Sequence, residues 1–279
     1  MNGTVRGKRP VQGEPVLDRA FRMLGAFGPA DRALSLAALS SRAGLPKPTT
    51  LRIARKLVDW GALERTPGGE YVIGLRLLEL ASLAPRGHGL RATALPYMED
   101  LLHATRQHVL LAVRDGEHAI LVERLSARGA GRVMYRVGGR LPLHSTGVGL
   151  VLLAHAPAEI QERMLAADLR LEPEGAGLPA RDLRIQLAAI RREGVAVISR
   201  PWPEPMTSVA CAILGPDRIP AAAVSVLTRA AAADPAALTP AVIAVARAIS
   251  RAMSAPAQHA RLSLLSQRLE NPFLKVRQG

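Results

Sequence analysis

The feature that most constrains the fold of this chain is a pair of short helical segments joined by a tight turn at Gly44. Ser35 stands where an N-cap is needed, directly before the helical segment 36–43. Gly44 follows at the position where a left-handed residue ends many helices. Pro48 then fits the first turn of a second helix, which we expect to end at Gly61. The sequence therefore predicts a helix, a tight turn and a second helix in close succession.

The segments on either side of this pair extend the pattern. Residues 16–27 carry apolar side chains at the spacing of one helix face. Downstream, two strand-like segments at 62–65 and 70–73 are joined by the Gly-rich segment 66–69, which is typical of a hairpin. Three helices followed by a hairpin are the order of a winged helix-turn-helix, a fold that places its last helix in the major groove of DNA.

The second helix of the pair carries cationic and small hydroxyl side chains, as a helix that contacts DNA does. Arginine reads guanine with two hydrogen bonds, and small hydroxyls contact phosphates or base edges. The hairpin tip is placed to reach the neighbouring backbone or the minor groove. The alternative is a helical hairpin whose basic face is only solvated. The residues that we expect at the DNA are Lys47, Pro48, Thr49, Thr50, Arg52, Arg55, Lys56, Arg65, Gly68 and Gly69.

The charge of the chain favours a polyanionic partner. The formal net charge is +14, which promotes binding to phosphates through attraction and counterion release. Residues 1–90 contain 14 Lys and Arg against seven Asp and Glu, so a third of the chain carries half of the excess. An arginine content inherited from codon bias is the alternative explanation for part of the excess. It does not explain why the charge clusters on the second helix.

From residue 109 onward the sequence alternates strand-like and helical segments. Strands are indicated at 109–113, 119–125, 132–137, 195–199, 208–214 and 221–227. Helices are indicated at 147–154, 158–167, 181–192 and 240–253. Strands interleaved with flanking helices predict an α+β domain.

Several stretches of the chain resemble the IclR family of bacterial transcription regulators. Residues 34–52 read LSLAALSSRAGLPKPTTLR, where the family has L-x-L-x-x-L-A-x-x-x-G-L-P-K-S-T-V-x-R. Residues 69–78 read GEYVIGLRLL and residues 141–149 read LPLHSTGVG, similar to the family's G-x-Y-x-L-G-x-x-L and L-P-L-H-A-T-A-x-G-K. Further matches lie at 190–194 and 209–213, so the resemblance covers most of the chain in the same order.

The resemblance implies an α+β protein with a winged helix-turn-helix, a linker helix and a C-terminal GAF-like effector domain of mixed sheet and helices. It also implies dimers through the N-terminal part, and often tetramers through the effector domains. We therefore expect a homodimer or a dimer of dimers on a pseudo-palindromic operator in double-stranded DNA. The expected parts are a flexible basic tail at 1–14, a DNA-binding domain at 15–74, a linker helix at 75–90, an effector-binding domain at 91–256 and a C-terminal tail at 257–279.

A loop that leads into a helix at 143–149 is the expected small-molecule site. Serine and threonine can cap this helix, and exposed amides at its start favour an anion such as a carboxylate. In the family this loop and two strands line the effector pocket. The alternative for each residue is a role only in turning the chain and packing the sheet. The resemblance implies the effector-binding residues His144, Ser145, Thr146, Gly147, Ser208, Ala210 and Ser225.

Three departures from the family pattern fall at or near this site. Leu150 replaces the lysine that usually follows the glycine, and Ser208 stands where many members have cysteine. The segment 200–205 replaces an acidic one, so Arg200 is a candidate partner for an acid and Trp202 for a ring. A rigid Pro-rich surface loop is the alternative interpretation of this segment.

The sequence argues against several other classes of protein. It lacks a G-x-S-x-G elbow, a Walker loop and a cluster of metal ligands, so we expect no enzyme, no metal and no cofactor. The single cysteine, Cys211, excludes an internal disulfide and is interpreted as a buried strand residue. No uninterrupted apolar run approaches the roughly 20 residues of a membrane span, and no signal-peptide pattern occurs. We therefore expect a soluble, cytoplasmic protein with no membrane partner.

Together these features predict a sequence-specific transcription regulator whose affinity for its operator is controlled by a small metabolite. A carboxylic or aromatic acid suits the expected site. The alternative is a DNA-binding protein without a small-molecule effector, either architectural or constitutive.

Overall fold

The computed structural model describes residues 14–167, 170–171, 176–177, 179–201 and 204–254. These residues form two compact units, which divide between Ala84 and Pro85. Each unit has its own hydrophobic core. The tail expected at 257–279 and all but the last residue of the tail expected at 1–14 lie outside the described residues.

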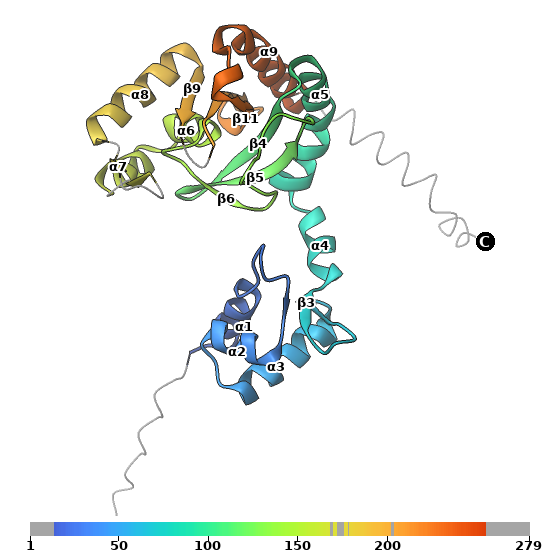
Figure 1. Ribbon diagram of the computed structural model, residues 1–279. Coiled ribbons are helices and arrows are strands. Elements are labelled where there is room, and N and C mark those ends of the chain that lie inside the picture. The colour runs from blue at the N-terminus through green and yellow to red at the C-terminus, as the bar shows by residue number, and fades with distance from the viewer. Residues whose placement is uncertain (1–13, 168–169, 172–175, 178, 202–203, 255–279) are drawn as a thin grey trace, which may run out of the picture. The chain divides into compact units, whose positions relative to one another are not determined.

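The N-terminal unit is a helical domain with a small antiparallel sheet (Figure 1). Its first helices are α1 (Val16–Gly25), α2 (Leu36–Ala43) and α3 (Lys47–Trp60). Its strands are β1 (Ala33–Leu34), β2 (Leu63–Arg65) and β3 (Tyr71–Ile73), in the order β1-β3-β2. Met23, Leu39 and Ile53 bring the three helices together in one core. The predicted winged helix-turn-helix is confirmed, and β1 is a strand that the sequence pattern did not reveal.

The turn between α2 and α3 follows from its capping residues. Ser35 Oγ accepts a hydrogen bond from the backbone N–H of Ala38 at 3.2 Å, which caps α2. Gly44 has a φ of 61°, and its N–H donates to carbonyls in the last turn of α2. A residue with a Cβ is strained in this conformation, so glycine sets the direction in which the chain leaves α2. The expected roles of Ser35 and Gly44 are confirmed.

The segment after the hairpin is divided into separate helices. α4 (Leu75–Ser82) belongs to the N-terminal unit. A short π-helix, η1 (Pro85–Gly89), leads into α5 (Leu90–Thr105) of the C-terminal unit. The segment 75–90 was expected as one linker helix. It instead contains α4 before the division between Ala84 and Pro85, and η1 after it.

The C-terminal unit is built on a six-stranded antiparallel sheet. Its strands are β4 (His108–Asp115), β5 (His118–Leu125), β6 (Arg140–Pro142), β9 (Val195–Arg200), β10 (Met206–Leu214) and β11 (Pro220–Arg229). Their order across the sheet is β6-β5-β4-β11-β10-β9. β7 (Arg170–Leu171) and β8 (Ala176–Gly177) form a separate two-stranded pair, and they come between β6 and β9 in the chain.

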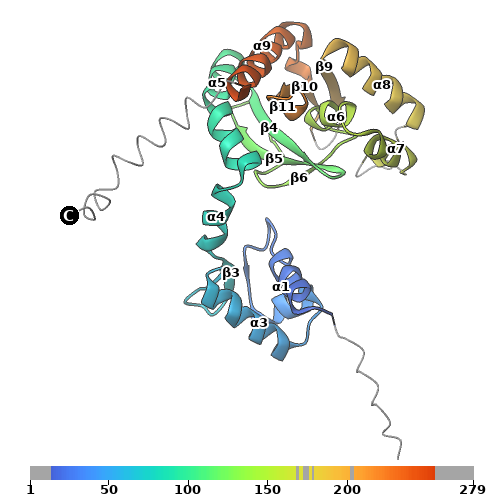
Figure 2. The ribbon, with the colours of Figure 1, turned by 180° about the vertical axis from the view of Figure 1, so that it is seen from behind.

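Helices cover both faces of this sheet (Figures 1 and 2). One face carries α6 (Gly147–Ala154), α7 (Ala158–Ala166) and α8 (Ala180–Glu193). The other carries α5 and α9 (Pro235–Ser254), and the 3-10 helix η2 (Ala230–Ala232) precedes α9. Alternate residues of β10 serve the two cores, with Ala210 in the core of α6 and Cys211 in that of α9. This architecture confirms the predicted α+β class.

The long helix α9 is part of the core despite its apolar composition. By length and composition it is the one described helix that qualifies as a candidate membrane span. It buries Val242, Ala246 and Ile249 in the core that it shares with α5 and the sheet. Core helices of globular domains have the same composition, so the feature is weak evidence for a membrane.

The prediction of a strand at 132–137 is wrong. This segment is a loop between β5 and β6, where the carbonyls of Val133 and Tyr135 accept hydrogen bonds from Arg124 Nη1 at 3.4 and 2.6 Å. The side chain of Arg124 thus supplies hydrogen bonds that a neighbouring strand would supply in a sheet. Glycines with positive φ at 129, 131 and 138 turn the chain at both ends of the loop.

Candidate nucleic-acid interface and ligand pocket

The solvent-facing side of α3 carries half of the residues expected at DNA. Its exposed members are Lys47, Pro48, Arg52, Arg55 and Lys56. Spacings of three and four residues place the last three on one side of the helix. The first carboxylate of α3 is Asp59, in the last turn. Up to that residue the charge of the helix is therefore entirely positive.

Asp59 does not neutralise this surface. Lys56 Nζ lies 3.8 Å from Asp59 Oδ2, and the two side chains are 83% and 67% exposed. Ion pairs with this exposure contribute little free energy and are easily exchanged for another partner. Lys56 thus remains available to a phosphate.

The opposite side of α3 is anchored in the core of the N-terminal unit. Ile53 and Ala54 are buried there, and Leu57 packs against the same cluster. Rotation of α3 would expose these side chains to water, which is unfavourable. The core therefore fixes which side of the helix faces outward.

The two threonines near the start of α3 differ from the exposed cationic residues. Thr50 is fully buried, and its Oγ1 donates to the carbonyl of Pro46 at 3.1 Å. A buried hydroxyl bonded to the backbone cannot reach a base edge, so the expected DNA contact of Thr50 is wrong. Thr49 is half-buried and keeps part of its surface open.

The hairpin of the N-terminal unit ends in a compact tip. Arg65 Nε donates to the carbonyl of Gly69 at 3.3 Å, and Gly69 has a φ of 84°. Gly68 is exposed, and Thr66 closes the turn by accepting a hydrogen bond from the N–H of Gly69 at 2.9 Å. The guanidinium of Arg65 is thus held beside a tip with little side-chain bulk.

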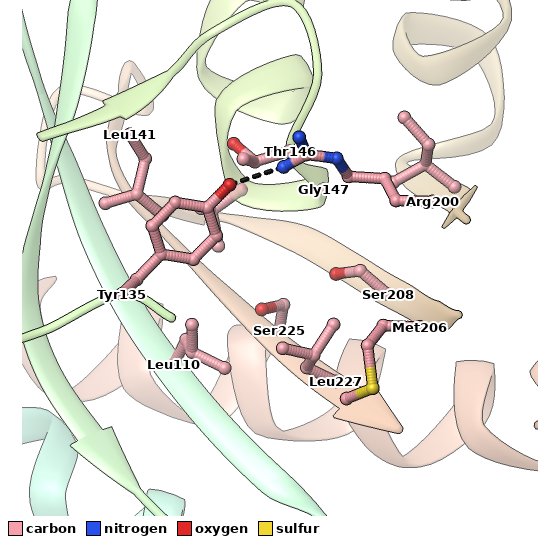
Figure 3. Close-up of a pocket in the computed structure, with 12 residues that line it drawn as sticks. Leu110, Tyr135, Leu141, Thr146, Gly147, Arg200, Met206, Ser208, Ser225 and Leu227 are labelled. Carbon is pink, nitrogen blue, oxygen red and sulfur yellow. Dashed lines mark hydrogen bonds between the residues drawn. The ribbon is translucent and has the colours of Figure 1, made fainter. Parts of the chain in front are cut away.

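A small cavity lies in the C-terminal unit, where the start of α6 meets β10 and β11 (Figure 3). Its volume is about 40 Å³. Hydrophobic side chains form most of its wall, and a few hydroxyls and one guanidinium open into it. The lining residues are Leu110, Tyr135, Leu141, Thr146, Gly147, Val148, Ile198, Arg200, Met206, Ser208, Ser225 and Leu227.

The cavity separates the residues expected to bind an effector into two groups. Those that line it are Thr146, Gly147, Ser208 and Ser225. Those that do not line it are His144, Ser145 and Ala210. Ser145 is buried in the loop before α6, and Ala210 lies in the core beneath Gly147. Direct ligand contacts by the second group are therefore not supported by the geometry of this cavity.

The close approach of α6 to β10 requires glycine at position 147. A Cβ on Gly147 would lie 2.3 Å from Ser208 Oγ and 3.3 Å from the Cβ of Ala210. The first separation is far inside van der Waals contact, so a larger residue would push the helix and strand apart. The approach brings the first amides of α6, at the positive end of the helix dipole, to the cavity.

Thr146 holds this helix start in place. Its Oγ1 accepts a hydrogen bond from the N–H of Gly149 at 3.1 Å and donates to the carbonyl of Pro142 at 2.8 Å. The predicted cap is confirmed for Thr146, whereas Ser145 precedes it in the loop. Because both hydrogen bonds are internal, Thr146 shapes the cavity more than it offers a free hydroxyl.

Ser208 and Ser225 face the cavity from neighbouring strands. The strand register pairs Ser208 with Leu227 and Ser225 with Ala210, so the two serines lie on the same face of the sheet. Both are buried, at 7% and 2% exposure. They provide two hydroxyls on a floor that is otherwise apolar (Figure 3).

Tyr135 and Arg200 reach the cavity from different elements and meet there (Figure 3). Arg200 Nη1 donates a hydrogen bond to the hydroxyl of Tyr135. Arg200 ends β9 and was expected near the site, whereas Tyr135 lies in the loop mistaken for a strand. One sequence feature could have pointed to Tyr135: it is an aromatic residue between glycines in a chain that has only 3% aromatic residues.

A larger hollow adjoins the cavity. Its volume is about 340 Å³, and Tyr135 and Arg200 line both spaces. Arg132, Arg140 and Glu204 add charged groups to the larger one. The Tyr135–Arg200 pair therefore belongs to the wall of both spaces, together with Met206 and Leu227. Trp202, expected to stack on a ring, lies outside the described residues.

Cys211 lies on β10 in the core shared with α9. It is 3% exposed, and burial raises the pKa of its thiol to about 12. The thiol therefore stays protonated and unreactive at neutral pH. Its prediction as a buried strand residue is confirmed.

Comparison with known proteins places both units in one family. The IclR helix-turn-helix domain matches residues 16–67, and the bacterial transcriptional regulator IclR C-terminal domain matches residues 84–255. The chain is 31% identical to the glycerol operon regulatory protein of Streptomyces coelicolor, over 75% of this chain and 83% of that protein. It is 25% identical to the transcriptional repressor IclR of Escherichia coli, over 75% of this chain and 78% of that protein.

A solved structure supports the same assignment across both units. An IclR homolog from Microbacterium hydrocarbonoxydans, complexed with 4-hydroxybenzoate, is 31% identical to the chain with a TM-score of 0.79. The match covers 86% of this chain and 100% of that one. The resemblance found in the sequence is thus confirmed. The chain belongs to the IclR family of bacterial transcription regulators, which are not enzymes but DNA-binding proteins with an effector-binding domain.

Proposed function

We propose that the chain regulates transcription by binding an operator through α3 and the hairpin, and that a small aromatic or carboxylic acid in the α6 cavity controls this binding. The observation that carries the proposal is the convergence of Arg200 and the start of α6 on a mostly apolar cavity. A guanidinium and helix amides favour a carboxylate, whereas the apolar wall favours a ring or short hydrocarbon.

The polar floor narrows the ligand class further. Ser208 and Ser225 offer hydroxyls on the sheet side of the cavity. A ligand with a carboxylate at one end and a hydroxyl at the other would satisfy both groups. The relative complexed with 4-hydroxybenzoate is a protein bound to a compound of this kind. Hydroxylated aromatic acids are therefore the first compounds to test.

The size of the cavity implies a rearrangement on binding. At about 40 Å³ it is far smaller than the roughly 300–1,000 Å³ of typical small-molecule pockets. The adjoining hollow of about 340 Å³ falls inside that range. A ring-bearing acid would therefore displace Arg200 from Tyr135 and join the two compartments. The ligand carboxylate then replaces the tyrosine hydroxyl as the partner of Arg200.

Exposed apolar side chains in the N-terminal unit support a homodimer. On α1, Leu17 and Phe21 are 65% and 64% exposed. On α4, Leu75 and Leu78 are 67% and 66% exposed, and Leu83, which directly follows this helix, is 77% exposed. Burial of such surfaces against a second copy is favourable. Two copies would place two α3 helices on a pseudo-palindromic operator, with half-sites about one helical turn apart.

Coupling between the two functions would run through the segment 75–90. Effector binding would change how the units of a dimer, or of a dimer of dimers, are arranged. The affinity for DNA would then shift by a coupling free energy of typically 1–3 kcal/mol, or about 5- to 150-fold. Such a regulator would act in the cytoplasm, where its operator is.

The proposal is tested by titrating promoter DNA that flanks the gene of this protein, with and without 4-hydroxybenzoate and related acids. Fluorescence anisotropy measures the affinity. We expect an acid-dependent change in the wild type that is absent in the Ser208→Ala/Ser225→Ala variant. The matched control is Ser199→Ala, because Ser199 lies on β9 but does not line the cavity.

Two results would contradict the proposal. If the wild type did not bind this DNA at low ionic strength, the role of α3 would be lost. If DNA bound but no acid in the panel changed the affinity, the alternative of a constitutive or architectural DNA-binding protein would replace it.

A further inference from the structure

A separate hollow lies at the opposite end of β10 from the α6 cavity. β9 pairs with β10 only as far as the Val195–Cys211 pair, so none of the described strands covers the β9 side of residues 212–214. The space beside this uncovered edge is lined by α9 and by the ends of α6 and α8. Its volume is about 430 Å³, which falls within the range of small-molecule pockets.

Three arginines from two elements line this hollow. Arg247 and Arg251 are one turn apart on α9 and therefore share a face of that helix. Arg218 comes from the turn between β10 and β11. Among the described residues, none of the three has a carboxylate partner within 4 Å. By contrast, Arg163 and Arg184 of the same unit each lie 2.6 Å from a glutamate.

The acidic groups near the hollow are already engaged. Glu193 lines it, and its Oε1 accepts a hydrogen bond from Arg192 at 2.7 Å. Asp217, next to Arg218, accepts a hydrogen bond from the N–H of Ile219 at 3.0 Å. Glu193 is thus paired with an arginine other than the three, and the hollow keeps a net positive charge even when Asp217 is counted.

The backbone at Arg218 has an unusual conformation. Its φ is +62°, a region that residues with a Cβ rarely adopt. Two hydrogen bonds close the turn. The N–H of Arg218 donates to the carbonyl of Gly215 at 2.9 Å, and the N–H of Gly215 donates to the carbonyl of Ile219 at 2.8 Å. Such conformations persist only where the surroundings hold them, and they cluster at functional sites. Here the strained residue is also one of the three arginines of the hollow.

The remaining wall distinguishes the hollow from a merely charged surface. His155 lines it, and the Nδ1 atom of this histidine is hydrogen-bonded to the carbonyl of Val151 at 2.9 Å. Ile243 and Leu214 add apolar contact. A charged rim over a partly apolar floor suits a compact organic anion better than a single inorganic ion.

We propose that this hollow is a second binding site of the C-terminal unit, for a compact ligand that carries two or more negatively charged oxygen groups. Planar guanidinium groups pair with carboxylate and phosphate oxygens through two parallel hydrogen bonds. Phosphate esters and polycarboxylates share this chemistry. The site does not use any residue of the α6 cavity, and the inference stands whether or not that cavity binds an effector.

The test measures binding of pyrophosphate and of citrate to the full-length protein at constant ionic strength. Isothermal titration calorimetry gives the affinity, and thermal denaturation gives the rise in Tm that a ligand of the folded state causes. We expect saturable binding of at least one anion to the wild type. In Arg247→Gln/Arg251→Gln the affinity should fall about tenfold or more, since two charged hydrogen-bond donors are lost.

Matched variants separate this site from the other cationic surfaces. Arg184→Gln removes an exposed arginine of α8, and Arg55→Gln/Lys56→Gln removes charge from α3. Both should bind the anion as the wild type does, as should Ser208→Ala/Ser225→Ala. Arg218→Gln provides an independent change within the hollow and should also weaken binding.

Each result decides the question. Binding of pyrophosphate alone supports a phosphate ester, and binding of citrate alone supports a polycarboxylate. The inference is overturned if neither anion binds, if the α9 double variant and Arg218→Gln bind normally, or if only Arg55→Gln/Lys56→Gln loses binding. In the last case the anion occupies the DNA-binding surface instead.

Discussion

Helices α3 and α6 serve their units in opposite ways. α3 buries one side in the core and presents charged side chains on the other. α6 buries all eight of its residues and presents only its first turn to the cavity. In the proposed function the first helix acts through exposed side chains, and the second through backbone amides and close packing. Changes on the exposed side of α3 should therefore affect binding without affecting stability, whereas changes in α6 should affect both.

The largest expected effect is on stability, from Leu150→Ala in α6. Leu150 is fully buried in the core between the sheet and α8. Its truncation should lower the free energy of unfolding by about 2–5 kcal/mol, because it leaves a cavity. Urea denaturation measures the change. Ile185→Ala, at a position of α8 that is 59% exposed, is the control and should cost far less. Equal costs at the two positions would show that α6 is not the tightly packed helix described above.

Gly147→Ala should have the next largest effect. The added Cβ would lie 2.3 Å from Ser208 Oγ and 2.9 Å from Ser208 Cβ. Overpacking of this kind costs about 1–3 kcal/mol of stability, and the methyl group also fills the cavity. Binding of 4-hydroxybenzoate, measured by calorimetry, should be lost.

A double variant tests the cause of that effect. Ser208→Gly removes the two atoms that would lie closest to the new methyl group. Gly147→Ala/Ser208→Gly should therefore be more stable than the sum of the two single changes predicts. Strict additivity would mean that the clash is relieved elsewhere.

On α3, Arg52→Ala should weaken operator binding and leave stability unchanged. An arginine that reads a base contributes about 1–3 kcal/mol to discrimination. Anisotropy with operator and scrambled DNA measures the change, and urea denaturation should detect none. Thr50→Val is the contrasting variant, because the Thr50 hydroxyl is internal. It should lower stability with little effect on specificity, and the reverse pattern for the two variants would invert the assigned orientation of α3.

Tyr135→Phe tests the proposed ligand site and should have a smaller effect, on ligand affinity. The variant loses the hydroxyl that accepts a hydrogen bond from Arg200. If the ligand must displace this bond, the affinity for 4-hydroxybenzoate should rise by a few-fold, in line with about 0.5–1.5 kcal/mol for a hydrogen bond. Tyr97→Phe on α5 is the control. Weaker binding by Tyr135→Phe would instead place the hydroxyl on the ligand.

The helix-turn-helix could be predicted because its signals are local. Ser35 and Gly44 each act within one turn of their own positions, so their identity reveals their role. The error at Thr50 was avoidable in principle. Thr50 lies three residues before Ile53 and four before Ala54, so helical periodicity places it on their buried side. At this position helical periodicity is therefore a stronger signal than the tendency of hydroxyls near a helix start to contact DNA.

The ligand site was only partly predictable because its parts are distant in sequence. Gly147 and Ser208 meet only because α6 packs across β10, and Ser225 joins them through the pairing of β10 with β11. Tyr135 enters from a loop that has the alternating apolar pattern of a strand but no strand partner. Local patterns do not fix strand order, so they cannot show which residues will share a cavity.

The smallest expected effect is a pH dependence of stability in the C-terminal unit. His108, at the start of β4, is 3% exposed, and its Nε2 lies 3.1 Å from the carbonyl of Gly131. Burial lowers the pKa of His108 below 6.5, and the nearby charge of Arg124 acts in the same direction. The unfolded chain therefore binds a proton more readily than the folded one. Stability is retained above pH 6.5 and falls as the pH drops through that value toward the lower pKa of the folded state.

Replacement of this histidine should remove its part of the pH dependence. In His108→Gln the difference in unfolding free energy between pH 7.5 and pH 5.5 should be smaller than in the wild type, as measured by urea denaturation at both values. His103→Gln is the control, because His103 is exposed on α5. An unchanged pH dependence in His108→Gln would confine the acid sensitivity of the unit to other groups.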